Sequence, residues 1–448
     1  MNPIRITLIS LFATVILPLA GCSQLPATLP SEEATIVQPV KATTEVPTQQ
    51  LKGLAASTTY QIRNFNDLYN PYWLTDIGQY SSMAVNSAGN PVIAIYDGTR
   101  NDPRLIDSRS SVAPYGNGDL KLVVCNDPTC SSTTITTVDR GTTHYTDDVG
   151  RYNSMVLDSR GFPVIAYYDR GNGLMLAHCA DTTCTSKSIK KLIAAPINDI
   201  SLALDRYGQP IIAYTESNSN NSSVLSLIRC TDDTCSGFKR PVSIDAAQEA
   251  SLAINRNNEA VISYYNATYG DLMVATCERE CSAKRTQVVD SAGNVGKYNS
   301  LVLIPFQDPR GQIVERPFVS YYDATNGDLK TAYCGNAACT AGNVFQTVDS
   351  DGDVGQYTSL KLSSRGGPVM SYYDVTNSDL KVAYCDPGQP FAKIPTTPCQ
   401  EKQYNIIQTV DNYKDVGQYS SLVLDANNNA VISYYYTSYK GLRFARRQ

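Results

Sequence analysis

The stretch Asp353–Leu360 reads Asp-Val-Gly-Gln-Tyr-Thr-Ser-Leu, and it recurs along the chain. It returns as Asp-Val-Gly-Gln-Tyr-Ser-Ser-Leu at Asp415–Leu422 and, more loosely, as Asp-Ile-Gly-Gln-Tyr at Asp76–Tyr80. Such self-similarity indicates a repeat architecture and overrides the domain count suggested by length alone. Alignment on the serine of the motif gives seven copies, spaced by about 56 residues. The aligned serines are Ser82, Ser154, Ser201, Ser251, Ser300, Ser359 and Ser421.

Each copy contains four short runs that are rich in Val, Ile, Thr and Tyr and are separated by Gly, Asn, Asp or Pro. This composition predicts strands joined by tight turns, and no helical period of comparable strength appears. Seven four-stranded repeats indicate an all-β, seven-bladed β-propeller, in which radial closure protects the sheet edges. A string of independent sheets is the alternative. The four runs are typified by Tyr419–Leu424, Pro368–Asp374, Asp379–Cys385 and Tyr404–Asp411.

The seventh copy ends at Gln448, just after its third strand at Leu442–Ala445. The missing fourth strand is predicted before the first copy, where Thr58–Arg63 resembles the other fourth strands. An amino-terminal strand would then complete the last blade and close the ring. The propeller is expected to span residues 58–448.

The repeat also resembles a known group of proteins. Val319–Asp323 reads Val-Ser-Tyr-Tyr-Asp, and Asn326–Lys330 reads Asn-Gly-Asp-Leu-Lys. These motifs look like repeats of secreted bacterial sialidase-like (BNR-type) propellers. The resemblance covers residues 58–448 and implies a fold rather than an activity, because propellers host unrelated functions. The chain has no Ser-x-Asp-x-Gly-x-x-Trp box, its single Trp is Trp73, and no arginine triad is identifiable.

Composition narrows the function further. The 448 residues include 30 Tyr but only 2 His, and the formal net charge is −5. An acidic chain without a long basic run argues against binding to nucleic acid. Two histidines leave little room for a histidine-rich metal site, and no cofactor is expected. One of them, His178, is interpreted as structural.

The amino terminus sets the expected compartment. Arg5 precedes the apolar run Ile6–Leu19, which is too short for a stable membrane span and reads as a signal sequence over residues 1–21. Leu19–Cys22 reads Leu-Ala-Gly-Cys and resembles a bacterial lipobox, which implies a lipid-modified Cys22; an ordinary secretory signal is the alternative. Residues 22–57 are rich in Pro and Thr and are interpreted as a flexible tether. We expect a protein attached to a membrane, with the outer membrane favoured.

Twelve cysteines form six close pairs at the same place in successive repeats. One pair per blade cannot supply the four ligands of a structural zinc site, so disulfides in an oxidising compartment are predicted. Each would close the hairpin between the third and fourth strands. The pairs are Cys125 with Cys130, Cys179 with Cys184, Cys230 with Cys235, Cys277 with Cys281, Cys334 with Cys339 and Cys385 with Cys399.

Strand direction alternates in an antiparallel meander, so two sets of loops must share one face of the ring. We call it the top face: it carries the inter-blade loops and the loops between second and third strands, and the cysteine hairpins lie on the opposite, bottom face. Second strands end on the top face in a mostly polar set, which suggests either cation ligands or acid/base groups, or else residues that cap their own turns. Repetition favours the turns, and the recurring Ser and Tyr are likewise assigned to blade packing first. Asp349, Asp351 and Asp353 form a weak calcium candidate, although no metal is expected. The second-strand ends are Asp97, Asp169, Glu216, Asn266, Asp323, Asp374 and Tyr436.

The repeat symmetry breaks in one sector. Blade 1 has an expanded second-to-third connection, Gly98–Gly118, and the inter-blade loops into blades 1 and 2 carry aromatic residues. Long aromatic loops on a rigid ring are typical of functional sites, although these loops could also cap the closing strand. The predicted ligand-binding residues are Tyr69, Tyr72, Trp73, Arg100, Arg104, Arg109, His144 and Tyr145.

Three functions fit these observations. A binding module that recognises a glycan or an extended peptide through the blade 1 sector is preferred. A glycoside hydrolase or lyase would need two top-face carboxylates about 5 to 9.5 Å apart. An envelope assembly subunit would dock through its bottom face, for which an exposed apolar patch is expected. Binding is favoured over catalysis.

Overall fold

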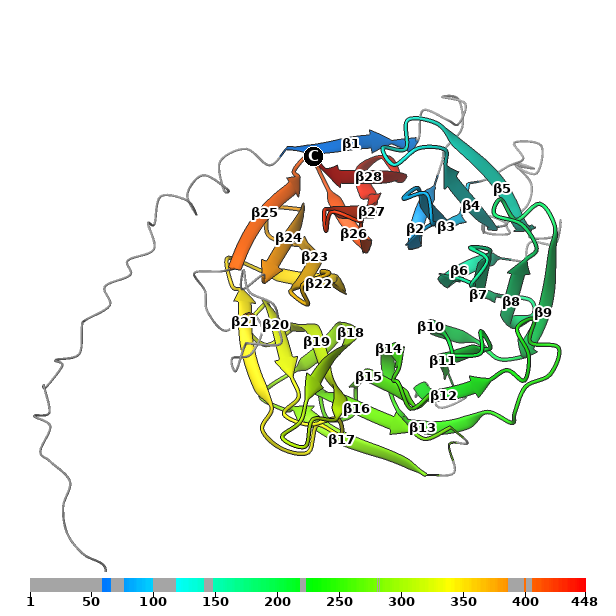
Figure 1. Ribbon diagram of the computed structural model, residues 1–448. Coiled ribbons are helices and arrows are strands. Elements are labelled where there is room, and N and C mark those ends of the chain that lie inside the picture. The colour runs from blue at the N-terminus through cyan, green and yellow to red at the C-terminus, as the bar shows by residue number, and fades with distance from the viewer. Residues whose placement is uncertain are drawn as a thin grey trace, which may run out of the picture. The chain divides into compact units, whose positions relative to one another are not determined.

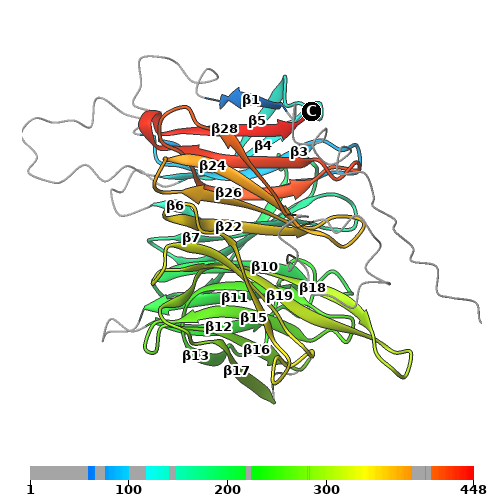
Figure 2. The same cartoon turned by 90° about the vertical axis from the view of Figure 1, so that its left-hand side faces the viewer.

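The computed structural model describes residues 59–65, 76–99, 118–140, 148–217, 223–279, 281, 283–385, 399 and 405–448. These residues form seven four-stranded antiparallel sheets arranged around a central axis (Figure 1). The predicted seven-bladed β-propeller is therefore confirmed. Figure 2 shows the ring edge-on, with its strands crossing the thickness of the disc. Within the described part of the chain, no helix has the length and apolar character needed to cross a bilayer.

The first strand of each blade lies nearest the axis and the fourth lies at the rim (Figure 1). Blade 1 comprises β2 (Ile77–Val85), β3 (Pro91–Asp97), β4 (Asp119–Cys125) and β5 (Thr133–Arg140). Blade 2 comprises β6 (Val149–Leu157), β7 (Pro163–Asp169), β8 (Gly173–Cys179) and β9 (Lys187–Ile193). Blade 3 comprises β10 (Ile197–Leu204), β11 (Pro210–Ser217), β12 (Ser223–Arg229) and β13 (Val242–Ala246). Blade 4 comprises β14 (Gln248–Ile254), β15 (Ala260–Asn266), β16 (Asp271–Cys277) and β17 (Lys284–Asp290).

The remaining blades follow the same order. Blade 5 comprises β18 (Val295–Gln307), β19 (Ile313–Asp323), β20 (Asp328–Tyr333) and β21 (Val344–Asp349). Blade 6 comprises β22 (Val354–Leu362), β23 (Pro368–Asp374), β24 (Asp379–Cys385) and β25 (Asn405–Asp411). Blade 7 comprises β26 (Val416–Leu424), β27 (Ala430–Tyr436), the 3-10 turn η5 (Thr437–Tyr439) and β28 (Gly441–Arg447).

The last blade is completed by β1 (Tyr60–Asn64), which pairs antiparallel with β28 over five residue pairs, from Tyr60 opposite Arg447 to Asn64 opposite Arg443. The predicted clasp between the two ends of the propeller is therefore confirmed, with the strand beginning two residues later and ending one residue later than expected. The hydroxyl of Tyr60 also lies 3.0 Å from that of Tyr384 in blade 6, so β1 links two blades.

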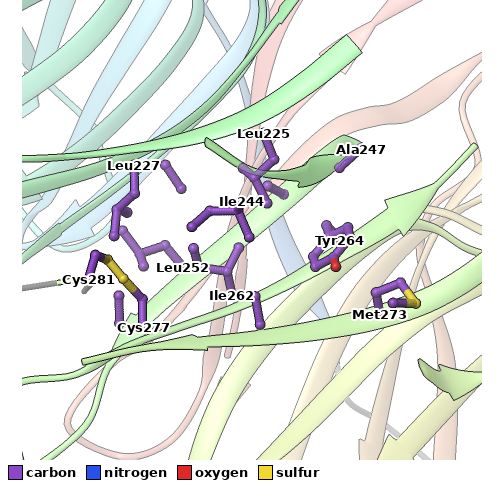
Figure 3. Close-up of a cluster of buried hydrophobic side chains, with 14 of the residues drawn as sticks. Leu225, Leu227, Ile244, Ala247, Leu252, Ile262, Tyr264, Met273, Cys277 and Cys281 are labelled. Carbon is purple, nitrogen blue, oxygen red and sulfur yellow. A yellow bond between two sulfur atoms is a disulfide. The ribbon is translucent and has the colours of Figure 1, made fainter. Parts of the chain in front are cut away.

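Apolar side chains from neighbouring blades interlock to form the core. The second strands β3 and β15 are buried along their whole length, because both of their faces meet another blade. Figure 3 shows the cluster between blades 3 and 4, where Leu225 and Leu227 face Ile262 and Leu252. The core is thus divided into layers between blades, and each blade depends on its neighbours.

The glycine in the motif that opens the repeat is required for steric reasons. Gly355 has φ +109°, and a Cβ on it would lie 2.8 Å from the Cα of Leu329 in the preceding blade. Only glycine fits this close approach between blades. Gly78, Gly150, Gly296 and Gly417 meet the same kind of obstacle.

The seven aligned serines join the blades through one repeated hydrogen bond. Ser300 Oγ accepts a bond of 3.1 Å from the amide of Leu360 in the next blade, and Ser421 Oγ accepts one of 3.0 Å from Met83, which closes the ring. The assignment of these serines to blade hydrogen bonds is confirmed. The five other bonds run from Met155 to Ser82, Leu202 to Ser154, Leu252 to Ser201, Leu301 to Ser251 and Leu422 to Ser359.

All six predicted disulfides are present, each at the hairpin between the third and fourth strands, with Cα atoms 4.8 to 4.9 Å apart. Such bonds persist outside the reducing cytoplasm. The protein is therefore extracytoplasmic.

Candidate functional site on the propeller axis

The predicted ligand-binding residues of the blade 1 sector lie outside the described residues. These are Tyr69, Tyr72, Trp73, Arg100, Arg104, Arg109, His144 and Tyr145, and Cys22 lies outside them as well. The structure does, however, describe the strands of blades 1 and 2 that precede and follow these residues in the sequence.

The two sets of loops assigned to the top face meet in the structure. The amide of Thr437, after β27, donates to the carbonyl of Asp415, before β26, at 3.0 Å, and Gly98 donates to Asp76 at 2.7 Å in blade 1. The direction argument is therefore confirmed.

The four aspartates at the second-strand ends cap their own turns. Asp169 Oδ1 accepts a bond of 2.8 Å from the amide of Gly171, and Asp323 Oδ1 accepts one of 3.0 Å from Thr325. Asp97 and Asp374 accept backbone bonds from Thr99 and Asn377 in the same way. Their use by the fold argues against acid/base chemistry at this set of residues.

Two of the three candidate calcium residues, Asp349 and Asp353, are also occupied by fold contacts. Asp349 Oδ2 accepts a bond of 2.7 Å from the hydroxyl of Tyr372 and lies 2.6 Å from Lys381 Nζ. Asp353 Oδ1 accepts one of 2.8 Å from Tyr322. Among the described residues, no group of three or more His, Cys, Asp or Glu side chains could hold a metal ion.

A different set of side chains gathers on the axis, two residues before each aligned serine. In five blades the residue is a tyrosine, in the half of the first strand nearer the top face, with a left-handed φ of 51° to 53°. Such a φ is costly for a residue other than glycine. The five are Tyr80, Tyr152, Tyr298, Tyr357 and Tyr419.

These phenols form a continuous arc. The ring centroid of Tyr80 lies 4.7 Å from that of Tyr152 and 4.8 Å from that of Tyr419. The ring centroid of Tyr357 lies 4.8 Å from that of Tyr419 and 4.7 Å from that of Tyr298. The four ring contacts link the arc from end to end, from Tyr152 to Tyr298. Burial raises the pKa of Tyr80 and of Tyr152 to about 12, so the phenols stay neutral at physiological pH.

Two neighbouring blades depart from tyrosine at this position: blade 3 has Asp199 and blade 4 has Glu249. Glu249 keeps the left-handed φ, at 51°, and accepts a hydrogen bond from the amide of Tyr298. Asp199 Oδ2 accepts a bond of 2.5 Å from the amide of Ala250. The two carboxylates therefore continue the ring that the phenols leave open.

Both carboxyl groups are held in an environment that favours the neutral form. Both side chains are half-buried. Burial raises the pKa of Asp199 to about 6. Burial, reinforced by the negative charge of Asp199, raises the pKa of Glu249 to about 7, and the cation of Lys297 opposes this rise. The pair can therefore take up or release protons near neutral pH.

Sequence reasoning recognised the five tyrosines but not the two carboxylates. The signal was present, since Asp199 and Glu249 occupy the same alignment column as the tyrosines. A position where most copies share one residue and two adjacent copies share another chemistry is a break in symmetry, as informative as a long loop.

The described chain is thus a seven-bladed, disulfide-bonded propeller with an asymmetric polar ring on its axis. No family model matches it, and no curated protein matches its sequence.

Solved structures do match in fold. An ulvan lyase, described as a new family of polysaccharide lyase, has 9% identity and a TM-score of 0.51, covering 83% of this chain and 94% of that chain. A lectin from Burkholderia pseudomallei has 10% identity and a TM-score of 0.46, covering 82% and 97%. An α-L-arabinanase from Penicillium chrysogenum has 12% identity and a TM-score of 0.44, covering 70% and 93%. At these identities the likeness extends to the β-propeller fold.

Proposed function

We propose that this protein is a lipid-anchored envelope protein, attached through Cys22, whose propeller binds a glycan, or else an extended peptide, on its top face. The observation that carries the proposal is the polar ring on the axis, where five linked phenols meet Asp199 and Glu249. Carboxylates accept pairs of hydroxyl donors, and phenols supply both flat faces and hydroxyl groups. This combination suits a polyhydroxylated ligand.

The position of the ring supports a site shared with the blade 1 sector. Tyr80 and Tyr152 belong to blades 1 and 2, whose loops carry Trp73 and His144, and Asp199 follows in blade 3. A ligand that extends from the axis toward blades 1 and 2 would meet both groups of residues.

Binding to a glycan array tests this proposal. At pH 8, where both carboxyl groups are ionised, we expect Asp199→Asn and Glu249→Gln to weaken binding by at least about tenfold, because each removes a charged hydrogen-bond acceptor. Asp233→Asn is the matched control, since Asp233 is exposed on the bottom-face cysteine hairpin of blade 3. Unchanged binding in both axial variants would show that the axial ring is not part of the binding site. Unchanged binding in Trp73→Ala and Tyr72→Ala would show the same for the blade 1 sector.

A second candidate is glycoside hydrolysis or elimination with the axial pair as acid/base groups. The near-neutral pKa of Glu249 favours it, since a catalytic acid or base works best when its pKa lies near the working pH. Oligosaccharides that bind on the array would be incubated with the protein, and mass spectrometry would detect any cleavage products. Cleavage that disappears in Glu249→Gln while binding persists would support an enzyme, and intact oligosaccharides would leave binding alone.

A further inference from the structure

Blade 7 differs from its neighbours in the inter-blade loop that precedes it. Blades 5 and 6 have Gly293 and Gly352 at the third position after the fourth-strand aspartate, with φ +102° and +92°. Blade 7 has Lys414 there, with φ 65°. A long side chain therefore occupies a backbone conformation that favours glycine, at a cost in stability. Such a cost is commonly retained where the side chain serves a function.

The second top-face turn of blade 7 differs as well. Blades 5 and 6 have Asp323 and Asp374 at the end of the second strand, whereas blade 7 has Tyr436. Tyr436 is only 1% exposed, and its hydroxyl has no hydrogen-bond partner among the described residues. A buried hydroxyl left without a partner is costly in a protein interior.

Three tyrosines and a lysine form one cluster, which we call the blade 7 patch (Tyr413, Lys414, Tyr436 and Tyr439). Tyr413 and Tyr439 are 54% and 53% exposed, and both contact Tyr436, with ring centroids 6.1 and 4.9 Å apart. Lys414 Nζ lies 2.8 Å from the Tyr439 hydroxyl and 4.3 Å from the centre of its ring. The patch therefore offers two exposed aromatic rings within 5.6 Å of one cation.

The charge of this region is opposite to that of the neighbouring blade. Segments 411–415 and 436–443 of blade 7 carry three basic and two acidic side chains, whereas the matching segments 349–353 and 374–381 carry one basic and five acidic. Asp411 binds Arg443 at 2.7 Å, and Asp415 accepts a bond from Tyr373. No ion pair involves Lys414 within the described residues.

We propose that the blade 7 patch is a second ligand site, separate from the axial ring, and that it binds an anionic saccharide. The ring of one sugar unit would stack on Tyr439 or Tyr413, and its carboxylate or sulfate would bind the Lys414 ammonium group. Arg443 pairs with Asp411, and Lys440 lies 3.9 Å from Asp76, so Lys414 is the basic group of these segments that can bind an isolated negative charge. A nucleic acid, in contrast, requires a broad basic surface.

Calorimetric titration of the full chain with trigalacturonic acid tests the proposal, with the methyl ester of the same trisaccharide as the neutral probe. We expect the acid to bind and the ester to bind at least about tenfold more weakly, since a charge-assisted hydrogen bond is lost. A higher salt concentration should weaken the binding of the acid and leave the binding of the ester unchanged. Equal affinity for both probes, or no binding of the acid at millimolar concentration, would overturn the proposal.

Substitutions toward the other repeats locate the site without harming the fold. Lys414→Gly restores the glycine of blades 5 and 6, and Tyr439→Asn restores Asn326 and Asn377. Both should weaken trigalacturonate binding by about tenfold without lowering the unfolding midpoint. Tyr269→Asn is the matched control, since Tyr269 is 76% exposed in the equivalent turn of blade 4. If Glu249→Gln abolished binding and Lys414→Gly did not, the saccharide would occupy the axial ring and the blade 7 site would be refuted.

Discussion

Ser300 shows how much a single repeated side chain contributes to this ring. Its hydroxyl accepts a hydrogen bond from the amide of Leu360 in the next blade. Leu360 is only 1% exposed, so Ser300→Ala leaves a buried donor without an acceptor. We expect a loss of about 1 to 3 kcal/mol in the free energy of unfolding. Urea denaturation measures it, with Ser291→Ala as the control because Ser291 is exposed in the loop before blade 5. Equal stability of the two variants would show that this bond contributes nothing.

The axial carboxyls predict a dependence of stability on pH. Their folded-state pKa values of about 7 for Glu249 and about 6 for Asp199 lie above the values of about 4 in an unfolded chain. The folded state therefore binds more protons between these limits, so stability should fall as the pH rises from 4 to 7. Thermal unfolding at pH 5 and pH 8 tests this. The decrease should be smaller in Glu249→Gln, and an identical decrease in both proteins would contradict the assignment.

The roles of recurring residues were predictable, because a residue that returns at the same position of successive repeats serves the structure of the repeat. The roles of the serines and of the second-strand aspartates followed from repetition alone. Asp199 and Glu249 were missed because their raised pKa values arise from burial at the axis, which depends on closure of the ring. The cluster around Tyr436 was missed for a similar reason, since its turns are separated in sequence and meet only in the fold.

At the level of elements, strand bounds were predicted best where a turn residue marks the end. The run Pro368–Asp374 coincides with β23 and Asp379–Cys385 with β24, because proline opens one strand and aspartate closes it. First strands were predicted too short: β26 begins at Val416 rather than Tyr419. The bulge at Tyr419 interrupts the alternation of side chains, which conceals the residues before it.

The disulfide hairpins differ in the length of chain that they close. Cys334 and Cys339 are separated by 5 residues, and Cys385 and Cys399 by 14. In the chain-entropy account, replacing each pair by serines should cost about 2 and about 3 kcal/mol respectively, because the longer loop gains more freedom when unfolded. Urea denaturation of the two double variants measures the difference. A larger loss for the shorter loop would show that contacts within the hairpin outweigh loop entropy.

At the scale of the whole molecule, an axial hydrogen bond and a rim strand pairing close the ring, in addition to the side-chain packing between the last blade and the first. The bond from Met83 to Ser421 lies near the axis, and the pairing of β1 with β28 lies at the rim. The axial bond is repeated between all blades, whereas the rim pairing occurs once, in the blade that lacks a disulfide among the described residues. Closure at the rim therefore depends on a strand of five residues.

Truncation separates the clasp from the tether that precedes it. A chain without residues 1–65 loses β1, its five residue pairs with β28 and the contact of Tyr60 with Tyr384, which together should lower the free energy of unfolding by about 5 kcal/mol, at about 1 kcal/mol for each pair. A chain without residues 1–57 keeps β1, and its free energy of unfolding should equal that of the full-length chain. Because the axial bonds remain, the shorter chain should stay folded, with faster amide exchange confined to β27 and β28. Equal stability of the two truncations would mean that the propeller closes without its amino-terminal strand.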